Sequence, residues 1–546
     1  MKRNLSNFAL IAAIVLGICL PGCMVGPNYS PPKTRLEPHY GELRKTTSTE
    51  PAAQASYGVE QTPPAAKWWR SFHDPELDRL IDEAVRKNYV LQIAELRVRQ
   101  ARAVRGMAAS GLFPGIEANL GYNRALGSRN VELPFGGSGS GSTASGGSAS
   151  ASRTSATPKA RSMDPQGGIS PTTSASDAEA GGAGANSAAT PLSPFGGGGL
   201  PGATTDLFQA GFDSTWELDI FGGTRRRLQA ATAEIQAAVE TRRDVMVSLL
   251  AEVARDYMEL RGTQERLAVA RQNLDAQKQI QELTQSMYKA GLVSDLDTTR
   301  AAAQVATTTS TIPPLEAQVR ERIHALSTLL ARQPEALNKE LSQTKPLPPL
   351  PPQVPVGLPS QLLQRRPDIR AAERQIAAAT ARIGAAKADL FPKFSITGSM
   401  GLDSSHLDNF FEWNSRYFLF SPTVTWPIFS AGRIRSNIAL QKTNQQAALL
   451  AYRNTILAAL QEVEDALAVY ATQQARRTSL TEALRQSRQA LDIAQDQYKN
   501  GLVDFLTVLE AQRSVLAAQD SLAQSDESVS TGLVALYKSL GGGWQD

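Results

Sequence analysis

The chain has 546 residues, of which 42% are hydrophobic and 20% charged, so it contains enough apolar material to bury a core. Its formal net charge of +4 is too small for this length to indicate binding to nucleic acid. Both cysteines, Cys19 and Cys23, lie near the N-terminus. The composition therefore excludes a disulfide framework and a cysteine metal site in the rest of the chain.

Residues 1–22 are predicted to be a lipoprotein signal peptide. Two basic residues precede an apolar run from Phe8 to Leu20 that is too short to span a membrane as a helix. The run ends in Leu-Pro-Gly-Cys, which resembles the bacterial lipobox, so we expect cleavage before Cys23 and acylation of Cys23, including palmitate. Met24, where some bacterial lipoproteins have Asp, favours the outer membrane. The alternative is an ordinary secretory signal with an incidental cysteine.

Residues 23–66 are rich in proline and polar side chains and show little periodicity. This composition predicts an extended, lipid-anchored tether that lies over other parts of the protein. The first helix is expected from Asp74, a capping residue followed by a proline, to about Ser110. The pair Trp68-Trp69 before it is interpreted as packing or as an interfacial anchor.

Two segments, Ile116–Asn123 and Phe208–Ile220, alternate apolar and polar residues. This alternation is typical of a membrane β-barrel strand, although a half-buried strand of a soluble protein is the alternative for either segment alone. Between them, residues 126–205 are mostly Gly, Ser, Ala and Thr and cannot bury enough apolar area to fold alone. They are predicted to be a flexible loop at an outward-facing barrel mouth. Its glycine tracts lack the Gly-Lys-Ser/Thr of a phosphate-binding loop.

A very long helix is predicted from Phe221 to Gly291, a stretch without proline in which Gly262 is the one internal glycine. Apolar or aromatic residues recur every seven positions, broken only by Gln281, which specifies a narrow seam for coiled-coil packing. At 1.5 Å per residue this helix is roughly 100 Å long. The seam positions are Met246, Val253, Leu260, Leu267, Leu274 and Tyr288.

After a turn at Gly291, a helix is expected to return from Asp295 to Ala331, interrupted at Pro313-Pro314. Residues 346–359 contain seven prolines and are predicted to be a stiff linker that straps the two halves of the chain.

The chain contains two copies of one unit. Tyr288–Val293 matches Tyr498–Val503 at an offset of 210, and Leu112–Pro114 matches Leu390–Pro392 at an offset of 278. The copies are assigned to residues 67–345 and 360–540, followed by a tail, 541–546. The second copy is expected to contain a helix from Arg366 to before Pro392, strands Phe394–Met400 and Phe418–Ile428, a long helix from Arg433 to Gly501 and a return helix from Asp504 to Leu540.

The predicted fold class is mainly α with a membrane β-barrel, built from two repeats and four strands per chain. Four strands cannot close a barrel in a bilayer, where open sheet edges are not tolerated. The chain must therefore oligomerise so that its strands form one shared barrel, with the long helices in the periplasm.

The residues resemble the TolC-type outer-membrane factors, specifically the lipoprotein branch (OprM-like, NodT-type) of tripartite resistance-nodulation-division (RND) efflux systems. The resemblance covers nearly the whole mature chain. It implies a homotrimer with a twelve-stranded barrel and an α-helical tunnel, anchored by lipid in the outer membrane. It also implies a periplasmic adaptor and an inner-membrane RND pump as partners, small molecules as substrates, and no cofactor. The motifs that carry it are Cys23–Tyr29, Trp68-Trp69 with Asp74-Pro75, Arg365–Ile369, Tyr498–Leu506 and Leu540–Trp544.

The resemblance also implies which residues form the periplasmic gate and which contact the adaptor. The family pattern Leu-Thr-x-Leu-Asp-Ala-Gln-Arg corresponds to Leu506–Arg513, with Glu510 in place of the usual Asp. This match implies a periplasmic gate in which Leu506 forms an apolar ring, and Glu510 with Arg513 a charged ring. An ordinary surface ion pair is the alternative. The adaptor is expected to dock at the helix tips, at Gly291, Leu292, Val293, Gly501, Leu502 and Val503.

Other functions remain open at this point. An enzyme is disfavoured because the four histidines are scattered and neither His-Glu-x-x-His nor Gly-x-Ser-x-Gly occurs. A purely structural coiled-coil lipoprotein would lack the alternating strands. An exit duct for type I protein secretion or for metal efflux shares the expected fold, and the sequence does not name the substrate.

Overall fold

The computed structural model describes residues 24–42, 57–59, 66–126, 204–351 and 353–545. The predicted signal peptide, Cys23 and almost all of the loop 126–205 lie outside the described residues. The chain divides into two compact units. The helical unit comprises Met1–Pro114, Trp216–Ile396 and Pro422–Asp546, and the strand unit comprises Gly115–Thr215 and Thr397–Ser421.

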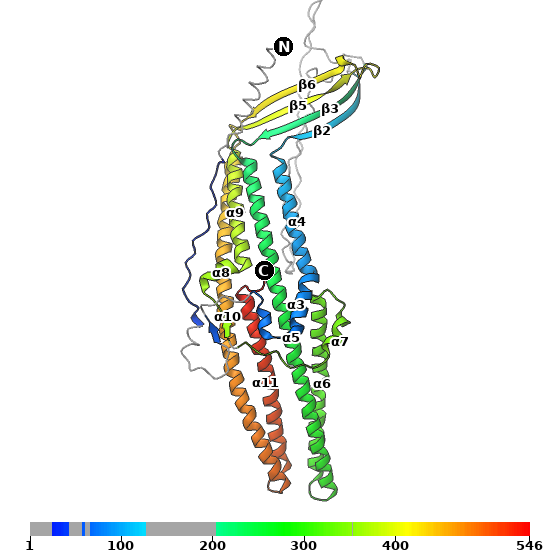
Figure 1. The fold of residues 1–546 in the computed structure, drawn as a ribbon, viewed down its shortest axis with the longest axis vertical. Coiled ribbons are helices and arrows are strands. Elements are labelled where there is room, and N and C mark those ends of the chain that lie inside the picture. The colour runs from blue at the N-terminus through cyan, green and yellow to red at the C-terminus, as the bar shows by residue number, and fades with distance from the viewer. Residues whose placement is uncertain (1–23, 43–56, 60–65, 127–203, 352, 546) are drawn as a thin grey trace, which may run out of the picture. The chain divides into compact units, whose positions relative to one another are not determined.

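The helical unit contains two sets of corresponding helices (Figure 1). The first repeat provides η1 (Trp68–Phe72), α3 (Pro75–Lys87), α4 (Tyr89–Ser110), α5 (Gly223–Lys289), α6 (Asp295–Leu329), η2 (Pro334–Leu337) and α7 (Asn338–Leu341). The second provides α8 (Pro359–Arg365), α9 (Pro367–Ala388), α10 (Arg433–Lys499) and α11 (Phe505–Ser539).

Three pairs of corresponding helices in the two repeats have equal lengths. Helices α4 and α9 each have 22 residues, α5 and α10 each have 67, and α6 and α11 each have 35. The duplication predicted from the sequence is therefore confirmed, and both long helices end within two residues of their predicted bounds.

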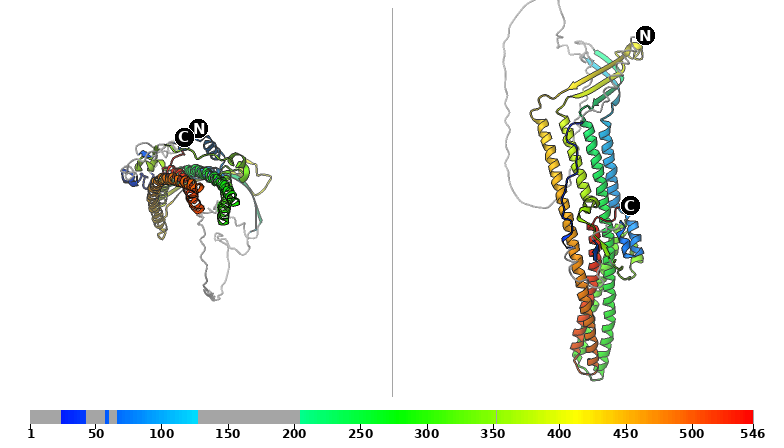
Figure 2. Two further views of the ribbon diagram at one scale, coloured as in Figure 1. Left: turned by 90° about the horizontal axis from the view of Figure 1, so that it is seen from below. Right: turned by 60° about the vertical axis from the view of Figure 1, so that its left-hand side comes forward.

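The helices lie side by side in one curved layer, seen along its length in Figure 2. Helix α4 contacts α5, α5 contacts α9, and α9 contacts α10. Helix α5 also contacts α6 and α11, and α11 contacts α10. The predicted seam of α5 lies in these contacts, since its members Val253 and Leu260 are fully buried. Val463 of α10 is fully buried as well. Burial of such side chains contributes about 1.5–3 kcal/mol each.

The seam of α5 differs from the prediction near its end. Tyr288 is 46% exposed, and the buried positions are instead Gln277 and Thr284. The buried row therefore advances by three residues after Leu274, as in a coiled coil whose heptad is locally interrupted. In α10 the equivalent Tyr498 stays buried, so the two hairpins are not alike at their tips.

The first predicted helix is two helices, because the chain breaks at Asn88. The Asn88 side chain accepts hydrogen bonds from the backbone N–H groups of Val90 and Leu91 and so caps α4. Its amide also donates to the backbone oxygen of Leu329 at 2.8 Å. These polar bonds replace the helical bond pattern at the joint.

The predicted interruption at Pro313-Pro314 is wrong, because α6 continues through both prolines. The prolines are exposed, and the carbonyls of exposed Thr309 and Ser310, which lose their N–H partners, can be hydrated. Leu315, just beyond, is buried against the main core. Packing therefore maintains the helix where local propensity would end it.

The long strands form one four-stranded sheet in the order β2-β3-β5-β6. Strands β2 and β3 are antiparallel, with Ala118 opposite Phe212 and Glu117 opposite Asp213. A short parallel pair joins β1 (Tyr57–Val59) to β4 (Gln353–Pro355) in the Pro-rich linker. The four long strands are β2 (Gly115–Leu126), β3 (Thr204–Leu218), β5 (Lys393–Ser404) and β6 (Arg416–Thr425).

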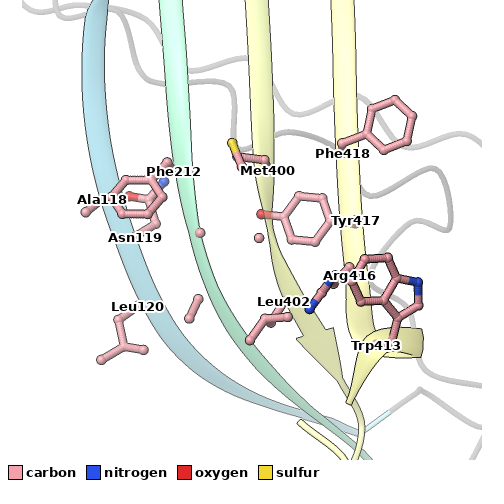
Figure 3. A pocket seen from close by; sticks show the side chains of 13 residues that line it. Ala118, Asn119, Leu120, Phe212, Met400, Leu402, Trp413, Arg416, Tyr417 and Phe418 are labelled. Carbon is pink, nitrogen blue, oxygen red and sulfur yellow. The ribbon is translucent and has the colours of Figure 1, made fainter. Parts of the chain in front are cut away.

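The two faces of the sheet differ as the alternation predicts. Tyr417 reaches across from β6 toward the neighbouring strands (Figure 3), and its hydroxyl lies 2.7 Å from where a Cβ on Gly211 would be. Large apolar side chains such as Leu120 and Phe418 are more than 80% exposed within one chain. Such side chains need an apolar environment, and for a membrane β-strand that environment is lipid. An apolar hollow of about 880 Å³ lies among these strands.

The described start of the tether, residues 24–42, lies on the helical unit. The buried guanidinium of Arg226 donates to the backbone oxygens of Val25 and Gly26 and to the Asn28 side chain. Farther along, the Tyr29 hydroxyl donates to Glu373 at 2.7 Å. These contacts tie the segment next to Cys23 to both repeats. Among the described residues, no helix carries an apolar run long enough to cross a bilayer.

Candidate functional site

One hairpin turn follows the C-terminal end of α5 and the other follows that of α10, and the two turns have the same backbone geometry. Gly291 and Gly501 adopt φ angles of 74° and 71°, in the left-handed region that favours glycine. In each turn the glycine N–H donates to the tyrosine three residues before, and the next leucine N–H donates to the residue five before, all at 2.9 Å. This is the Schellman pattern, which ends a helix sharply and reverses the chain.

Both return helices begin with a capping side chain. Ser294 and Asp297 form a capping box at the start of α6. The Asp504 carboxylate accepts from the hydroxyl of Thr507 at 2.7 Å and from its backbone N–H at 3.1 Å. The hydrogen bond from the Thr507 hydroxyl, followed by that from the backbone, lowers the pKa of Asp504. These two hydrogen bonds fix the Asp504 side chain at the start of α11.

The predicted docking residues divide into exposed and packed positions. Leu292 and Leu502 are 70% and 73% exposed, at equivalent places in the two turns. Val293 and Val503 instead pack on a shared apolar cluster that joins the two hairpins. We call this the tip cluster; its buried members are Ala301, Ala494, Tyr498, Phe505, Val508 and Leu509.

The predicted gate residues lie one to three turns into α11. Leu506 is half-buried, and Glu510 and Arg513 are exposed. Within the described part of the chain no ion pair joins Glu510 to Arg513. Arg513 Nε instead donates to the Gln304 side-chain oxygen on α6 at 2.8 Å. This partner is 209 residues away, so the local family pattern from which the gate was expected could not reveal it.

Leu506 and Arg513 belong to a longer row on α11. Continuing at intervals of seven residues, the row includes Asp520 and Glu527, and we call these four residues the α11 row. Asp520 accepts from Arg266 Nε of α5 at 2.7 Å. The row therefore faces the α5–α6 pair along about six helical turns, beside a hollow of about 740 Å³ that Arg513 and Asp520 help to line.

The arrangement offers reversible contacts between helices. No cluster of three or more potential metal-ligating side chains occurs in the part of the chain that the structure describes. Hydrogen bonds and ion pairs such as Arg513–Gln304 and Arg266–Asp520 can break and re-form as α11 moves. These contacts can therefore hold α11 against α5 and α6, or release it when they break.

The family model for outer membrane efflux proteins matches residues 175–332 and 358–542. The chain is 30% identical to the pyoverdine export outer membrane protein OpmQ of Pseudomonas aeruginosa, over 88% of each chain. It is 29% identical to the toluene efflux pump outer membrane protein TtgF of Pseudomonas putida, over 98% of this chain and 97% of that protein. The solved outer-membrane channel OprN is 31% identical and superimposes with a TM-score of 0.77, covering 96% of this chain and 100% of that one.

The paired hairpins, the four amphipathic strands and these likenesses define an outer-membrane channel with the TolC-type fold. The chain belongs to the outer membrane efflux protein family.

Proposed function

We propose that this protein is the outer-membrane exit duct of a tripartite RND-type efflux system, and that it passively conducts small toxic compounds from the periplasm to the exterior. The observation that carries the proposal is the repeated hairpin tip with one exposed leucine per turn, in a member of an efflux family. Relatives named for exporting pyoverdine and toluene support small molecules as substrates.

The proposed assembly is a homotrimer whose twelve strands form one barrel. Strands β2 and β6 are the edges of the sheet. Helices α4 and α10 are the two ends of the α4-α5-α9-α10 series, and both carry exposed apolar side chains. Different edges that meet between copies make a head-to-tail contact, and such a contact forms a ring when the rotation between copies closes, as the proposed trimer requires. The exposed side chains are Tyr89, Val90, Ile93, Leu96, Val104 and Met107 on α4, and Leu440, Leu450 and Leu457 on α10.

The proposed maturation places acyl chains on Cys23, immediately before the segment that Arg226 holds. Each buried CH₂ of an acyl chain contributes about 0.8 kcal/mol, so several chains anchor strongly. The anchor would fix the protein in the outer membrane independently of its strands.

The tips are proposed to meet a periplasmic adaptor, and Leu506, Glu510 and Arg513 to form the gate. Leu292 and Leu502 support this assignment because they lie at equivalent places in the two turns and expose apolar surface that a partner could cover. An adaptor that contacts only the open tips would shift the channel toward the open state. The chain then needs no catalytic group, and we infer that it is not an enzyme.

A Glu510→Ala variant is expected to raise single-channel conductance in planar bilayers several-fold, because it removes one charged ring from the proposed gate. Glu482→Ala is the matched control, since Glu482 is an exposed carboxylate on α10 that pairs locally with Arg485. Equal conductance of the Glu510→Ala variant and the wild type would show that Glu510 is not part of the gate.

The function is tested in a strain that lacks the gene, with and without the intact gene restored. Drug susceptibility and dye accumulation are measured together, so that changes in entry and in export are distinguished. We expect restored resistance to several unrelated amphiphiles. Unchanged susceptibility across a broad panel, with loss of an exported protein or of metal tolerance, would instead identify a secretion or metal-efflux duct.

A further inference from the structure

The one internal glycine of α5 lies directly opposite the last member of the α11 row. A Cβ built on Gly262 would lie 2.5 Å from Glu527 Oε2, 2.7 Å from its Cγ and 2.8 Å from its Cβ. No side chain larger than hydrogen fits at this position without displacing Glu527. Gly262 therefore forms a notch in α5 that receives the Glu527 side chain, and this explains a glycine that costs about 1 kcal/mol in a helix interior.

The Glu527 carboxylate is partly buried in this notch without a dedicated cation. The charged groups that face it are Glu259 and Arg266 of α5, Arg322 of α6 and Asp520 of its own helix. Both arginines are already paired: Arg266 with Asp520 at 2.7 Å, and Arg322 with Glu259 at 2.8 Å. In the part of the chain that the structure describes, no hydrogen bond or ion pair reaches the Glu527 carboxylate.

These surroundings favour the neutral acid. Burial, followed by the negative charge of Glu259, raises the pKa of Glu527 to about 7. The neighbouring arginines oppose the shift but do not cancel it. A carboxyl group with this pKa changes its charge within the physiological range.

We propose that Glu527 is a positioning residue for α11, which holds α11 in the Gly262 notch when protonated and loosens it when ionised. The notch and the row are features of the chain itself. Only the further step, that this movement reaches Leu506, Glu510 and Arg513 and changes the gate, rests on the proposed function.

The direction of the pH effect follows from linkage. Ionised Glu527 is better solvated outside the notch, so the packed state loses stability as pH rises through the pKa of the packed group. With a pKa of about 7 when packed and 4.5 when hydrated, the ratio of packed to detached α11 falls about tenfold between pH 6 and pH 8. Below about pH 4.5 both states are protonated and the ratio is constant.

The movement can be measured in the full-length protein in lipid nanodiscs. Asn273 of α5 and Gln519 of α11 are 2.8 Å apart between Nδ2 and Oε1. A bimane label on Gln519→Cys, with Asn273→Trp as quencher, reports this contact directly. We expect quenching to decrease as the pH rises from 5 to 8, with a midpoint between the two pKa values of Glu527, 4.5 and about 7.

Three further variants in the labelled protein decide the role of Glu527. Glu527→Gln is expected to keep quenching high and independent of pH. Gly262→Ala is expected to expel the side chain and keep quenching low throughout. Glu482→Gln, on the exposed surface of α10, should retain the wild-type profile. If Glu527→Gln retains the pH profile, the proposal is overturned.

Single-channel conductance of the unlabelled variants separates the two claims. If quenching titrates and conductance follows it, both the positioning role and the gate are supported. If quenching titrates and conductance does not, the positioning role stands while the assigned gate fails. If quenching does not titrate, the role proposed for Glu527 fails whatever the conductance shows.

Discussion

Replacing Arg366 by alanine is expected to lower the free energy of unfolding by about 3 kcal/mol. Arg366 is 8% exposed and joins three helices: it pairs with Asp368 and Glu462 at 2.7 Å each and donates to the Ser539 backbone oxygen at 2.9 Å. Removing one partner of a buried ion pair costs about 3–5 kcal/mol because the other charge is left uncompensated. The lower end applies here because Glu462 is 58% exposed and can be hydrated.

The change is measured by denaturant unfolding of the detergent-solubilised protein. Arg320→Ala is the matched control, since Arg320 is an exposed residue of α6, and its loss should change stability by less than about 0.5 kcal/mol. Arg366→Lys should recover part of the loss, because it restores the charge without the planar fork. A loss below 1 kcal/mol for Arg366→Ala would show that the three helices do not depend on this residue.

Placing carboxylates on the exposed face of α4 is expected to abolish assembly. In Ile93→Glu/Leu96→Glu, two side chains that are 50% and 53% exposed in one chain would be buried as charges at each proposed interface. An unpaired buried charge costs several kcal/mol, and a closed ring would repeat this cost at each interface. The trimer fraction should fall at least tenfold in size-exclusion chromatography with light scattering.

Leu407→Glu is the control for that experiment, because Leu407 is also exposed, at 64%, but lies beyond the end of β5. Its trimer fraction should match the wild type, and circular dichroism should show unchanged helix content in both variants. A stable trimer of the double α4 variant would place the contact between copies elsewhere.

The sequence was most informative about the long helices. A seven-residue period over some seventy residues is typical of a long helix, and the bounds of α5 and α10 were predicted within two residues. The shift of the α5 seam after Leu274 was not predicted. Breaks that depend on a distant contact could not be predicted. Asn88 ends α3 partly because its amide finds the Leu329 backbone oxygen, 241 residues away. Pro313 and Pro314 stay helical because the packing that follows them outweighs their local cost.

The candidate site was predicted in part. The turns at Gly291 and Gly501 follow from local chemistry, since a glycine after a long helix commonly adopts the left-handed conformation. The partners of the α11 row, Gln304 and Arg266, come from helices that only the fold brings near. A signal was nevertheless present, because residues 506, 513, 520 and 527 share one interval, and Gly262 alone interrupts the interior of α5.

The equal lengths of the paired helices restrict how the channel can evolve. With 67 residues in both α5 and α10 and 35 in both α6 and α11, each hairpin reaches as far as the other. An insertion in one helix alone would leave the two tips at different heights and shift the seam out of phase. Only simultaneous changes in all four helices, in whole heptads of roughly 10 Å each, preserve both the equal heights of the tips and the phase of the seam. The distance that this duct spans is therefore expected to change only in discrete steps, and the proposed adaptor would have to match it in the same steps.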